Sequence, residues 1–170
     1  MRKVLVILNF IFLVGCQNFH EVDPGKLYRS AQLNKAELAK VIDEYGIKTV
    51  INLRGERNQE GWFRDELAVT SAKNVELVNI GMGADRLPHK DDLVQLLDVL
   101  HTAQRPILVH CYQGADRTGE ASALYEIEYM GKSKTEALKM LTPRYFHLPW
   151  ATPSKTYFIN MYQGEKWAKE

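Results

Sequence analysis

Cys111 and Arg117, with five residues between them, carry the clearest chemical signal in the sequence. The residues between them are small or polar, and Gly114 lets the chain turn tightly. Such a segment can curl into a nest whose backbone N–H groups converge on one anion. The planar guanidinium of Arg117 matches two phosphate oxygens, and the same positive surroundings favour the nucleophilic thiolate of Cys111. The spacing therefore predicts nucleophilic attack on a bound phosphate group.

The segments on either side place this nest in an ordered setting. Residues 106–109 form a short apolar run of the kind found in strands buried on both faces of a sheet. A helix is expected over residues 118–129, closed by Gly131, and its positive N-terminal end points back at the nest. Ligands of α/β folds bind beyond the carboxyl ends of the strands. The nest should therefore lie at such an edge.

The rest of the chain alternates between strand and helix patterns. Asn34 with Glu37 suits a helix start, and an apolar stripe follows until Gly46. Ser133 and Glu136 form a second capping pattern. The further elements expected are strands at 49–53 and 75–80, and helices at 61–73, from about 88, from 133 to Pro143, and at 154–169. This order predicts an α/β fold with a mainly parallel central sheet flanked by helices.

The run His110-Cys111-Tyr112-Gln113-Gly114-Ala115-Asp116-Arg117-Thr118-Gly119 resembles the signature loop of protein tyrosine phosphatases. Its second half is most similar to the compact bacterial dual-specificity phosphatases. The resemblance extends less sharply over residues 25–145, including residues 27–32 and 50–54. It implies a dual-specificity phosphatase-like fold and a cysteinyl-phosphate intermediate, with no metal and no other cofactor.

Each residue of the loop has an expected part. The residues expected to bind the phosphate are Tyr112, Gln113, Gly114, Ala115, Asp116 and Arg117. His110 is expected to bond backbone groups behind the loop and to help hold the thiolate. Thr118 can donate its hydroxyl to the cysteine sulfur, cap the helix, or do both. The carboxylate of Asp116 is expected to face solvent or to bond nearby backbone.

Cleavage of a phosphate ester also needs an acid that protonates the leaving oxygen. Asp85 is the candidate, because it lies in a segment with two glycines that follows a predicted strand and could close over a ligand. Asp91 and Asp92 are its competitors, although carboxylates are common in the first turn of a helix. Arg54 and Arg57 could extend the positive rim, but a solvated loop is the expected setting for both.

The predicted substrate is a phosphorylated protein or a small phosphomonoester. Relatives directed at phosphoinositides often carry lysine where this chain has Tyr112, Gln113 and Ala115, so the sequence favours phosphotyrosine, alone or together with phosphoserine and phosphothreonine. One alternative is a phosphate-binding or interaction lipoprotein that has lost turnover. Another is a rhodanese-like sulfurtransferase, although its loop is usually shorter and lacks Arg-Thr-Gly.

The first sixteen residues read as a lipoprotein signal peptide. Two basic residues precede an apolar run that is too short to span a bilayer, and Leu13-Val14-Gly15-Cys16 resembles a bacterial lipobox. The resemblance predicts lipidation of Cys16 and an anchor on the cell envelope, and Gln17 after the cysteine favours the periplasmic side of the outer membrane over the inner membrane. Cys111 would then be the remaining thiol in an oxidising compartment. The alternative is an ordinary signal peptide in which the position of the cysteine is a coincidence.

The predicted mature chain comprises a flexible linker over residues 17–23 and one phosphatase domain over residues 24–170. The whole sequence has 22 basic and 21 acidic residues, which nearly balance, so nothing indicates binding to nucleic acid. The sequence leaves the oligomeric state open.

Overall fold

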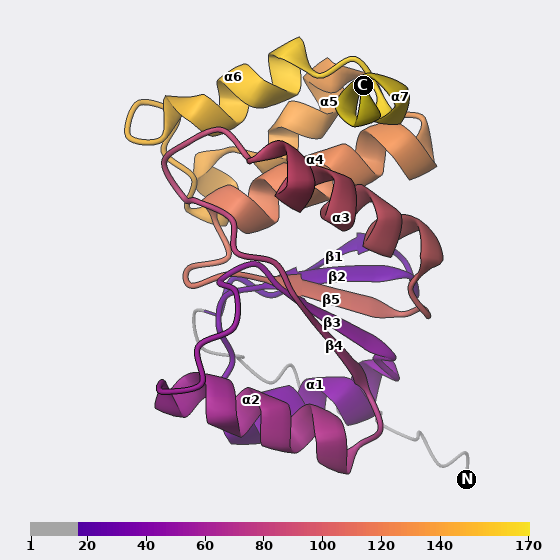
Figure 1. Ribbon diagram of the computed structural model, residues 1–170, viewed down its shortest axis with the longest axis vertical. Helices are drawn as coiled ribbons and strands as arrows, with labels where there is room; N and C mark the ends of the chain where they lie inside the picture. Colours follow the sequence, from indigo (N-terminus) through magenta and orange to yellow (C-terminus); the bar gives the residue numbers. More distant parts are fainter. Residues whose placement is uncertain (1–16) are drawn as a thin grey trace, which may run out of the picture.

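A five-stranded sheet between two layers of helices forms the domain (Figure 1). The computed structural model describes residues 17–170, so the predicted signal peptide and Cys16 lie outside the described residues. The strands are β1 (His20–Asp23), β2 (Leu27–Ser30), β3 (Thr49–Asn52), β4 (Glu76–Asn79) and β5 (Ile107–His110). The helices of three or more turns are α1 (Lys35–Tyr45), α2 (Gly61–Ala72), α3 (Lys90–Thr102) and α4 (Asp116–Met130).

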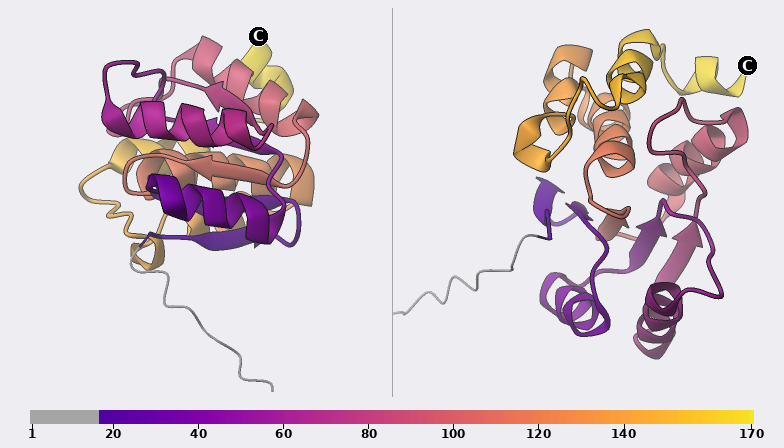
Figure 2. Two further views of the ribbon diagram at one scale, coloured as in Figure 1. Left: turned by 90° about the horizontal axis from the view of Figure 1, so that it is seen from below. Right: turned by 90° about the vertical axis from the view of Figure 1, so that its left-hand side faces the viewer.

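The strand order is β1-β2-β5-β3-β4, and every pair except β1 with β2 is parallel. The predicted mainly parallel sheet flanked by helices is therefore confirmed. Helices α1 and α2 cover one face of the sheet, and α3, α4 and the C-terminal helices cover the other, as the turned views show (Figure 2).

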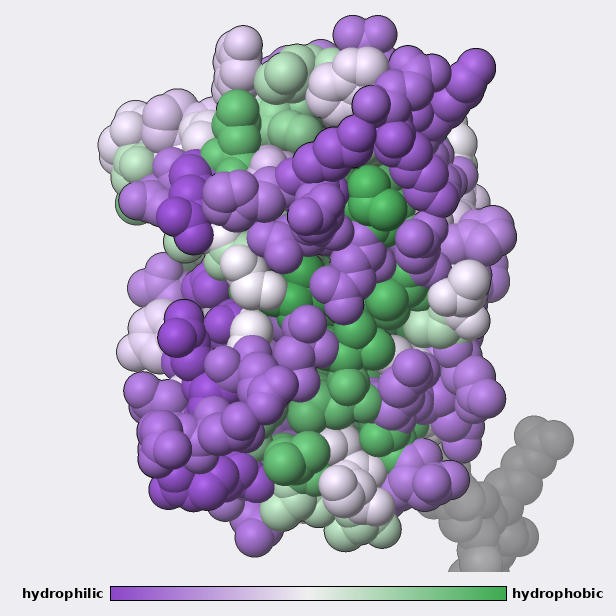
Figure 3. Space-filling view, in the orientation of Figure 1, coloured by the Kyte–Doolittle hydropathy of each residue, from purple (hydrophilic) through white to green (hydrophobic). Residues whose placement is uncertain are grey.

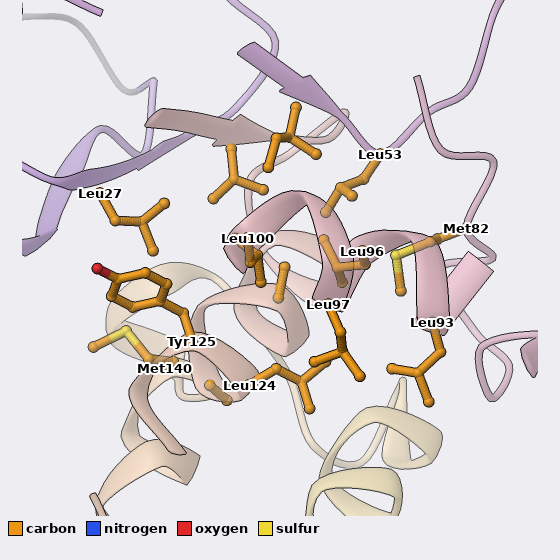
Figure 4. Packing of buried hydrophobic residues seen from close by; sticks show 14 of the residues in the cluster. Leu27, Leu53, Met82, Leu93, Leu96, Leu97, Leu100, Leu124, Tyr125 and Met140 are labelled. Atoms are coloured by element: carbon orange, nitrogen blue, oxygen red, sulfur yellow. The ribbon is translucent and has the colours of Figure 1, made fainter. Parts of the chain in front are cut away.

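Side chains alternate along the central strands between the two layers. Leu108 of β5 belongs to the core beneath α1 and α2, whereas its neighbours Ile107 and Val109 belong to the core beneath α3 and α4. In this second core, Leu97 and Leu124 are fully buried and lie beside each other (Figure 4). The sheet therefore has two cores.

Several element boundaries follow from residues seen in the sequence. The Asn34 side chain accepts a hydrogen bond from the Glu37 backbone N–H, and the Asn34 backbone N–H donates to the Glu37 carboxylate, as the capping pattern predicts. Gly46 closes the helix with φ 64°. Ser133 forms the same box at α5 (Lys134–Ala137), but that helix lasts four residues and passes into a 3-10 turn, Leu138–Met140.

The structure differs from the predictions at both ends of the domain. The predicted flexible linker, residues 17–23, includes strand β1, and Asn18 is buried, so this stretch is part of the folded domain. The single C-terminal helix predicted over 154–169 is instead two helices, α6 (Pro153–Met161) and α7 (Glu165–Lys169). Gly164, with φ 102°, lies between them and breaks the helical path.

The central parallel strands end together at one edge of the sheet. Ser30, His110 and Asn52 are paired across β2, β5 and β3, so the segments that follow them meet there. Strand β4 forms one lateral edge of the sheet, and its residues are only partly covered. In Figure 3, apolar residues show at the surface between the helical layers, where Figure 1 places this edge strand. Within residues 17–170, no helix is both long and apolar enough to cross a bilayer.

Candidate active site

The loop of residues 111–117, called the cysteine loop from here on, links β5 to α4. Cys111 directly follows the last residue of β5 and is 2 % exposed, so its thiol lies below the surface. Helix α4 begins at Asp116, two residues earlier than predicted. Its first turn, with the positive end of the helix dipole, therefore belongs to the cysteine loop itself.

Gly114 is the tightest point of the cysteine loop. Its φ is +69°, and a Cβ added there would lie 2.6 Å from the backbone nitrogen of Ala31 and 2.6 Å from the carbonyl carbon of Ser30. Both contacts are with backbone, which cannot move aside as a flexible side chain can. The loop therefore packs directly on the chain that leaves β2, and only glycine fits.

Two side chains hold the back of this loop. Asn18 donates to the carbonyl oxygens of Gln113 and Gly114 at 3.1 and 2.9 Å, and Arg29 donates to the Gly114 carbonyl at 2.7 Å. In a trans peptide the C=O and the following N–H point in opposite directions. The N–H groups of Gly114 and Ala115 therefore point away from these donors, toward the inside of the loop, as an anion nest requires.

Arg29 is a fully buried arginine. It also donates to the Met140 carbonyl at 3.0 Å and lies 4.1 Å from the centre of the Tyr145 ring. Burial lowers the pKa of Arg29 to about 10, which still leaves it protonated at neutral pH. Arg29 therefore places a fixed positive charge behind the cysteine loop.

Arg117 lies between two neighbouring segments at the edge of the sheet. Its Nη1 donates to the carbonyl oxygens of Leu53 and Met82 at 3.3 and 3.4 Å. Its Nε is buried and has no hydrogen-bond partner among the described residues. A buried donor without an acceptor is costly, so this side of the guanidinium suits a bound anion.

The hydroxyl of Thr118 does not bond the cysteine sulfur. It is fully buried and has no hydrogen-bond partner among residues 17–170, which differs from the predicted donation to Cys111. Because α4 starts at Asp116, Thr118 lies inside the first turn and is not the cap of the helix.

A buried pair of a histidine and a carboxylate lies behind the nucleophile. His110 Nε2 donates to Glu66 Oε1 at 3.0 Å, and Nδ1 lies 3.4 Å from the carbonyl oxygen of Cys111. Gln32 donates to the other Glu66 oxygen at 2.7 Å. Burial opposes ionisation of Glu66, but His110 and the hydrogen bond from Gln32 outweigh it, so the pKa of Glu66 is below its ordinary value. His110 therefore contacts the loop backbone as predicted, and it has a carboxylate partner that the sequence did not reveal.

Arg54 is not in a solvated loop. It donates to Gln32 Oε1 at 2.8 Å, stacks 3.5 Å from the centre of the Trp62 ring, and lies 5.1 Å from that of Tyr112. Arg57, by contrast, is exposed, as predicted. Arg54 therefore links the Glu66 pair to the surface beside the cysteine loop.

Asp116 turns its carboxylate away from solvent. Its Oδ1 accepts from His147 Nδ1 at 2.7 Å and from Thr152 Oγ1 at 2.6 Å. Burial opposes ionisation, but these two partners lower the pKa of Asp116. The carboxylate therefore ties the cysteine loop to residues 147–152, a contact that replaces the predicted solvent or local backbone.

Asp85 lies exposed in the loop of residues 81–88, which follows β4. The contact between Met82 and Arg117 brings the start of this loop next to the cysteine loop. Asp91 and Asp92 lie in the first turn of α3, as the sequence indicates. Asp91 also lines a surface depression with residues of α3 and α7. The start of the loop that carries Asp85 therefore lies beside the cysteine loop, and Asp85 stays the predicted acid.

An open groove runs beside the cysteine loop. It has a volume of about 820 Å³, and its surface is more apolar than polar. It is lined by Ala31, Gln32, Arg54, Trp62, Tyr112, Gln113, Pro143, Phe146 and Leu148. Tyr112 and Gln113 belong to the cysteine loop, so a group bound there would reach the groove directly.

This combination of sheet, loop and helix defines the class of cysteine-based phosphatases of the dual-specificity type. The chain belongs to the family described as DSP-PTPase phosphatase fused to NAD+ kinase, whose sequence profile matches residues 17–147. Two solved structures share the fold. The first is the core catalytic domain of the PP-IP phosphatase SIW14 from Saccharomyces cerevisiae, with a TM-score of 0.75 and 23 % sequence identity, and the match covers 92 % of this chain and 91 % of that one. The second is TpbA from Pseudomonas aeruginosa, with a TM-score of 0.70 and 22 % sequence identity, and the match covers 90 % of this chain and 89 % of that one.

Two curated proteins are also similar in sequence. The dual specificity protein phosphatase TpbA of P. aeruginosa is 31 % identical over 72 % of this chain and 52 % of its own length. The inositol diphosphatase SIW14 of S. cerevisiae is 26 % identical over 96 % of this chain and 58 % of its own length. The chain thus spans little more than half the length of these relatives. One solved TpbA variant is in complex with pTyr.

Sequence reasoning found the cysteine loop but missed the groups that support it. Asn18 was assigned to a linker, and Glu66 and Arg29 have partners far away along the chain. The one local signal was a charged residue, Arg29, in the short segment Leu27–Ser30, which forms a fully buried strand in the structure.

Proposed function

We propose that this chain is a cysteine-dependent phosphatase that hydrolyses phosphotyrosine monoesters through a cysteinyl-phosphate intermediate. The proposal rests on the hydrogen bonds that hold the back of the cysteine loop. The carbonyls of Gln113 and Gly114 are held by Asn18 and Arg29, so the N–H groups that follow them face inward above Cys111.

In the proposed mechanism the Cys111 thiolate attacks phosphorus in line with the leaving oxygen. Arg117 and the inward N–H groups stabilise the charge on the equatorial oxygens. Asp85 gives its proton to the leaving oxygen, so that tyrosine departs with its neutral phenol restored. Water then attacks the cysteinyl phosphate while Asp85 takes its proton, which releases inorganic phosphate and restores the thiolate.

The groove supports an aromatic phosphoester. Its walls carry the rings of Trp62, Tyr112 and Phe146, which can pack on a phenyl ring and on the peptide around it. Tyr112 and Gln113 carry no charge, whereas a densely phosphorylated inositol would need several cations near the loop. The cation within the groove lining is Arg54, which is already bonded to Gln32.

The test is turnover by the purified full-length protein. Substrates are p-nitrophenyl phosphate, a phosphotyrosine peptide, the matched phosphoserine peptide and an inositol pyrophosphate, with thiosulfate and cyanide as the sulfurtransferase assay. We expect phosphotyrosine to have the highest kcat/KM and Cys111→Ser to lose turnover while still binding the peptide.

Each alternative has a distinct result. A higher kcat/KM for the inositol pyrophosphate than for phosphotyrosine would indicate that this chain is an inositol diphosphatase, as SIW14 is described. Binding of phosphate without turnover would favour the interaction lipoprotein, and thiocyanate formation would favour the sulfurtransferase. Phosphoserine turnover at a similar rate would extend the substrate range to dual specificity.

We also propose that Cys16 carries a lipid anchor that holds the domain on the cell envelope, facing the periplasm. The proposal is supported by the lipobox-like residues before Cys16. Expression of the full chain and of Cys16→Ser, followed by membrane fractionation and mass spectrometry of the N-terminal peptide, tests it. Equal membrane association and no lipid adduct in both would refute it.

A further inference from the structure

A buried ion pair joins the C-terminal part of the chain to α4. Lys155 Nζ on α6 donates to Glu120 Oε2 on α4 at 2.8 Å, and both side chains are fully buried. Helix α6 lies beyond the residues that the family profile matches. Buried ion pairs are poor stabilisers, because the loss of hydration offsets most of their attraction, and an apolar pair often serves as well. The presence of the charges therefore calls for another explanation.

Lys155 has a second partner in the 81–88 loop. Its Nζ donates to the carbonyl oxygen of Arg86 at 2.8 Å, one residue after Asp85. The Arg86 side chain folds onto Gly83, where an added Cβ would lie 2.4 Å from its Nε. The backbone next to Asp85 is thus bonded to the Lys155 ammonium group, which Glu120 holds inside the domain.

The same stretch of chain also holds the cysteine loop. His147 and Thr152 both donate to Asp116, and Lys155 follows three residues later. Residues 147–155 therefore contact the loop that carries the nucleophile and the loop that carries the proposed acid. A charged hydrogen bond to a backbone carbonyl is directional and stronger than a neutral one, so it can set the position of a flexible loop.

We propose that Lys155 is a positioning residue: held by Glu120, it binds the Arg86 carbonyl and so places Asp85 over the phosphate bound at the cysteine loop. This inference rests on the proposed function and identifies one residue that orients its acid. Lys155 does not touch the substrate, and it acts through the backbone of the 81–88 loop.

The test uses leaving groups of different quality, because an acid matters more to a poor leaving group. The principal variant is Lys155→Met with Glu120→Gln, which removes both charges together and leaves no unpaired carboxylate. Its partner is Glu120→Gln alone, which keeps the ammonium and its bond to Arg86. The matched control is Lys132→Met, which removes a lysine paired with another buried carboxylate, Glu126, away from both loops.

We expect the double variant to lose about 10- to 100-fold in kcat/KM for phenyl phosphate and less than about threefold for p-nitrophenyl phosphate. Glu120→Gln should lose less for phenyl phosphate than the double variant, and Lys132→Met should match wild type for both esters. Alkylation of Cys111 by iodoacetate, and its protection by vanadate, should be unchanged in every variant.

Equal losses for the two esters, or wild-type turnover of phenyl phosphate by the double variant, would overturn the proposal. If the double variant fails to unfold cooperatively, Lys155→Gln with Glu120→Gln replaces it, since the shorter amide keeps a polar group but does not reach Arg86. A wild-type protein that turns over neither ester would instead refute the proposed phosphatase, and the positioning role with it.

Discussion

Replacement of Gly114 by alanine adds one methyl group where the cysteine loop passes closest to the end of β2. The methyl carbon would lie 2.6 Å from the Ala31 nitrogen and 2.7 Å from the Ser30 carbonyl oxygen, both of which are backbone atoms. The φ of +69° costs a residue with a Cβ about 1–2 kcal/mol. Overpacking against rigid neighbours adds about 1–3 kcal/mol. The free energy of unfolding should therefore fall by about 2–5 kcal/mol.

Gly25 offers a matched control. It has the same φ of +69°, but an added Cβ there would meet nothing within 4 Å. Gly25→Ala therefore carries the backbone cost without the clash. The difference between the two variants isolates the contact between the cysteine loop and β2, and it should be about 1–3 kcal/mol.

Urea unfolding followed by tryptophan fluorescence measures both variants, and protection of Cys111 from iodoacetate by vanadate reports the shape of the loop. We expect Gly114→Ala to lose this protection and Gly25→Ala to keep it. Equal destabilisation by the two substitutions, with full protection in both, would show that the cysteine loop does not pack on the end of β2.

Other substitutions test the acid and the buried supports. Asp85→Asn should lower kcat/KM for phenyl phosphate about 100-fold, whereas Asp91→Asn should leave it unchanged, as steady-state kinetics will show. Arg29→Met should weaken inhibition by vanadate at least about tenfold, because a loop carbonyl loses its charged donor. Burial opposes ionisation of Glu66, but His110 outweighs this effect and holds the pKa of Glu66 below its ordinary value. The stability from the ionised form is therefore present above the unfolded-state pKa and is lost as the pH falls through the folded-state value. In thermal scans, Tm should therefore fall less in Glu66→Gln than in wild type as the pH is lowered from neutral into the acidic range where Glu66 becomes protonated.

The parts of the site that the sequence predicted are those with local causes. The spacing of Cys111 and Arg117, the glycine between them, and the strand and helix on either side all lie within a few residues. The caps at Asn34 and Ser133 are equally local, and both are present. Local patterns therefore predicted the cysteine loop and most of the central elements.

The parts that the sequence did not predict depend on contacts between distant residues. Glu66 reads as an ordinary polar residue of α2 until the fold brings it to His110, which is 44 residues away. Asn18 looks like part of a linker, but its amide bonds the Gly114 carbonyl 96 residues later. Strand β1 is short, and its pairing with β2 depends on the sheet behind it rather than on its own four residues. No local pattern encodes such partners.

The distant contacts share one physical feature, which bears on how the site works. Arg29, Glu66 and Lys155 are each 2 % exposed or less, and each bonds either the backbone or a neighbour of one of the two loops. Burial of a charge costs free energy that offsets much of what the new bonds provide, so an apolar group of the same shape could stabilise the fold about as well. The charged groups instead position the two loops, because a charged hydrogen bond is strong and directional and holds the acceptor atom in place. A site built this way holds its donors in place before substrate arrives, so removal of one support should lower the rate by more than the lost stability accounts for.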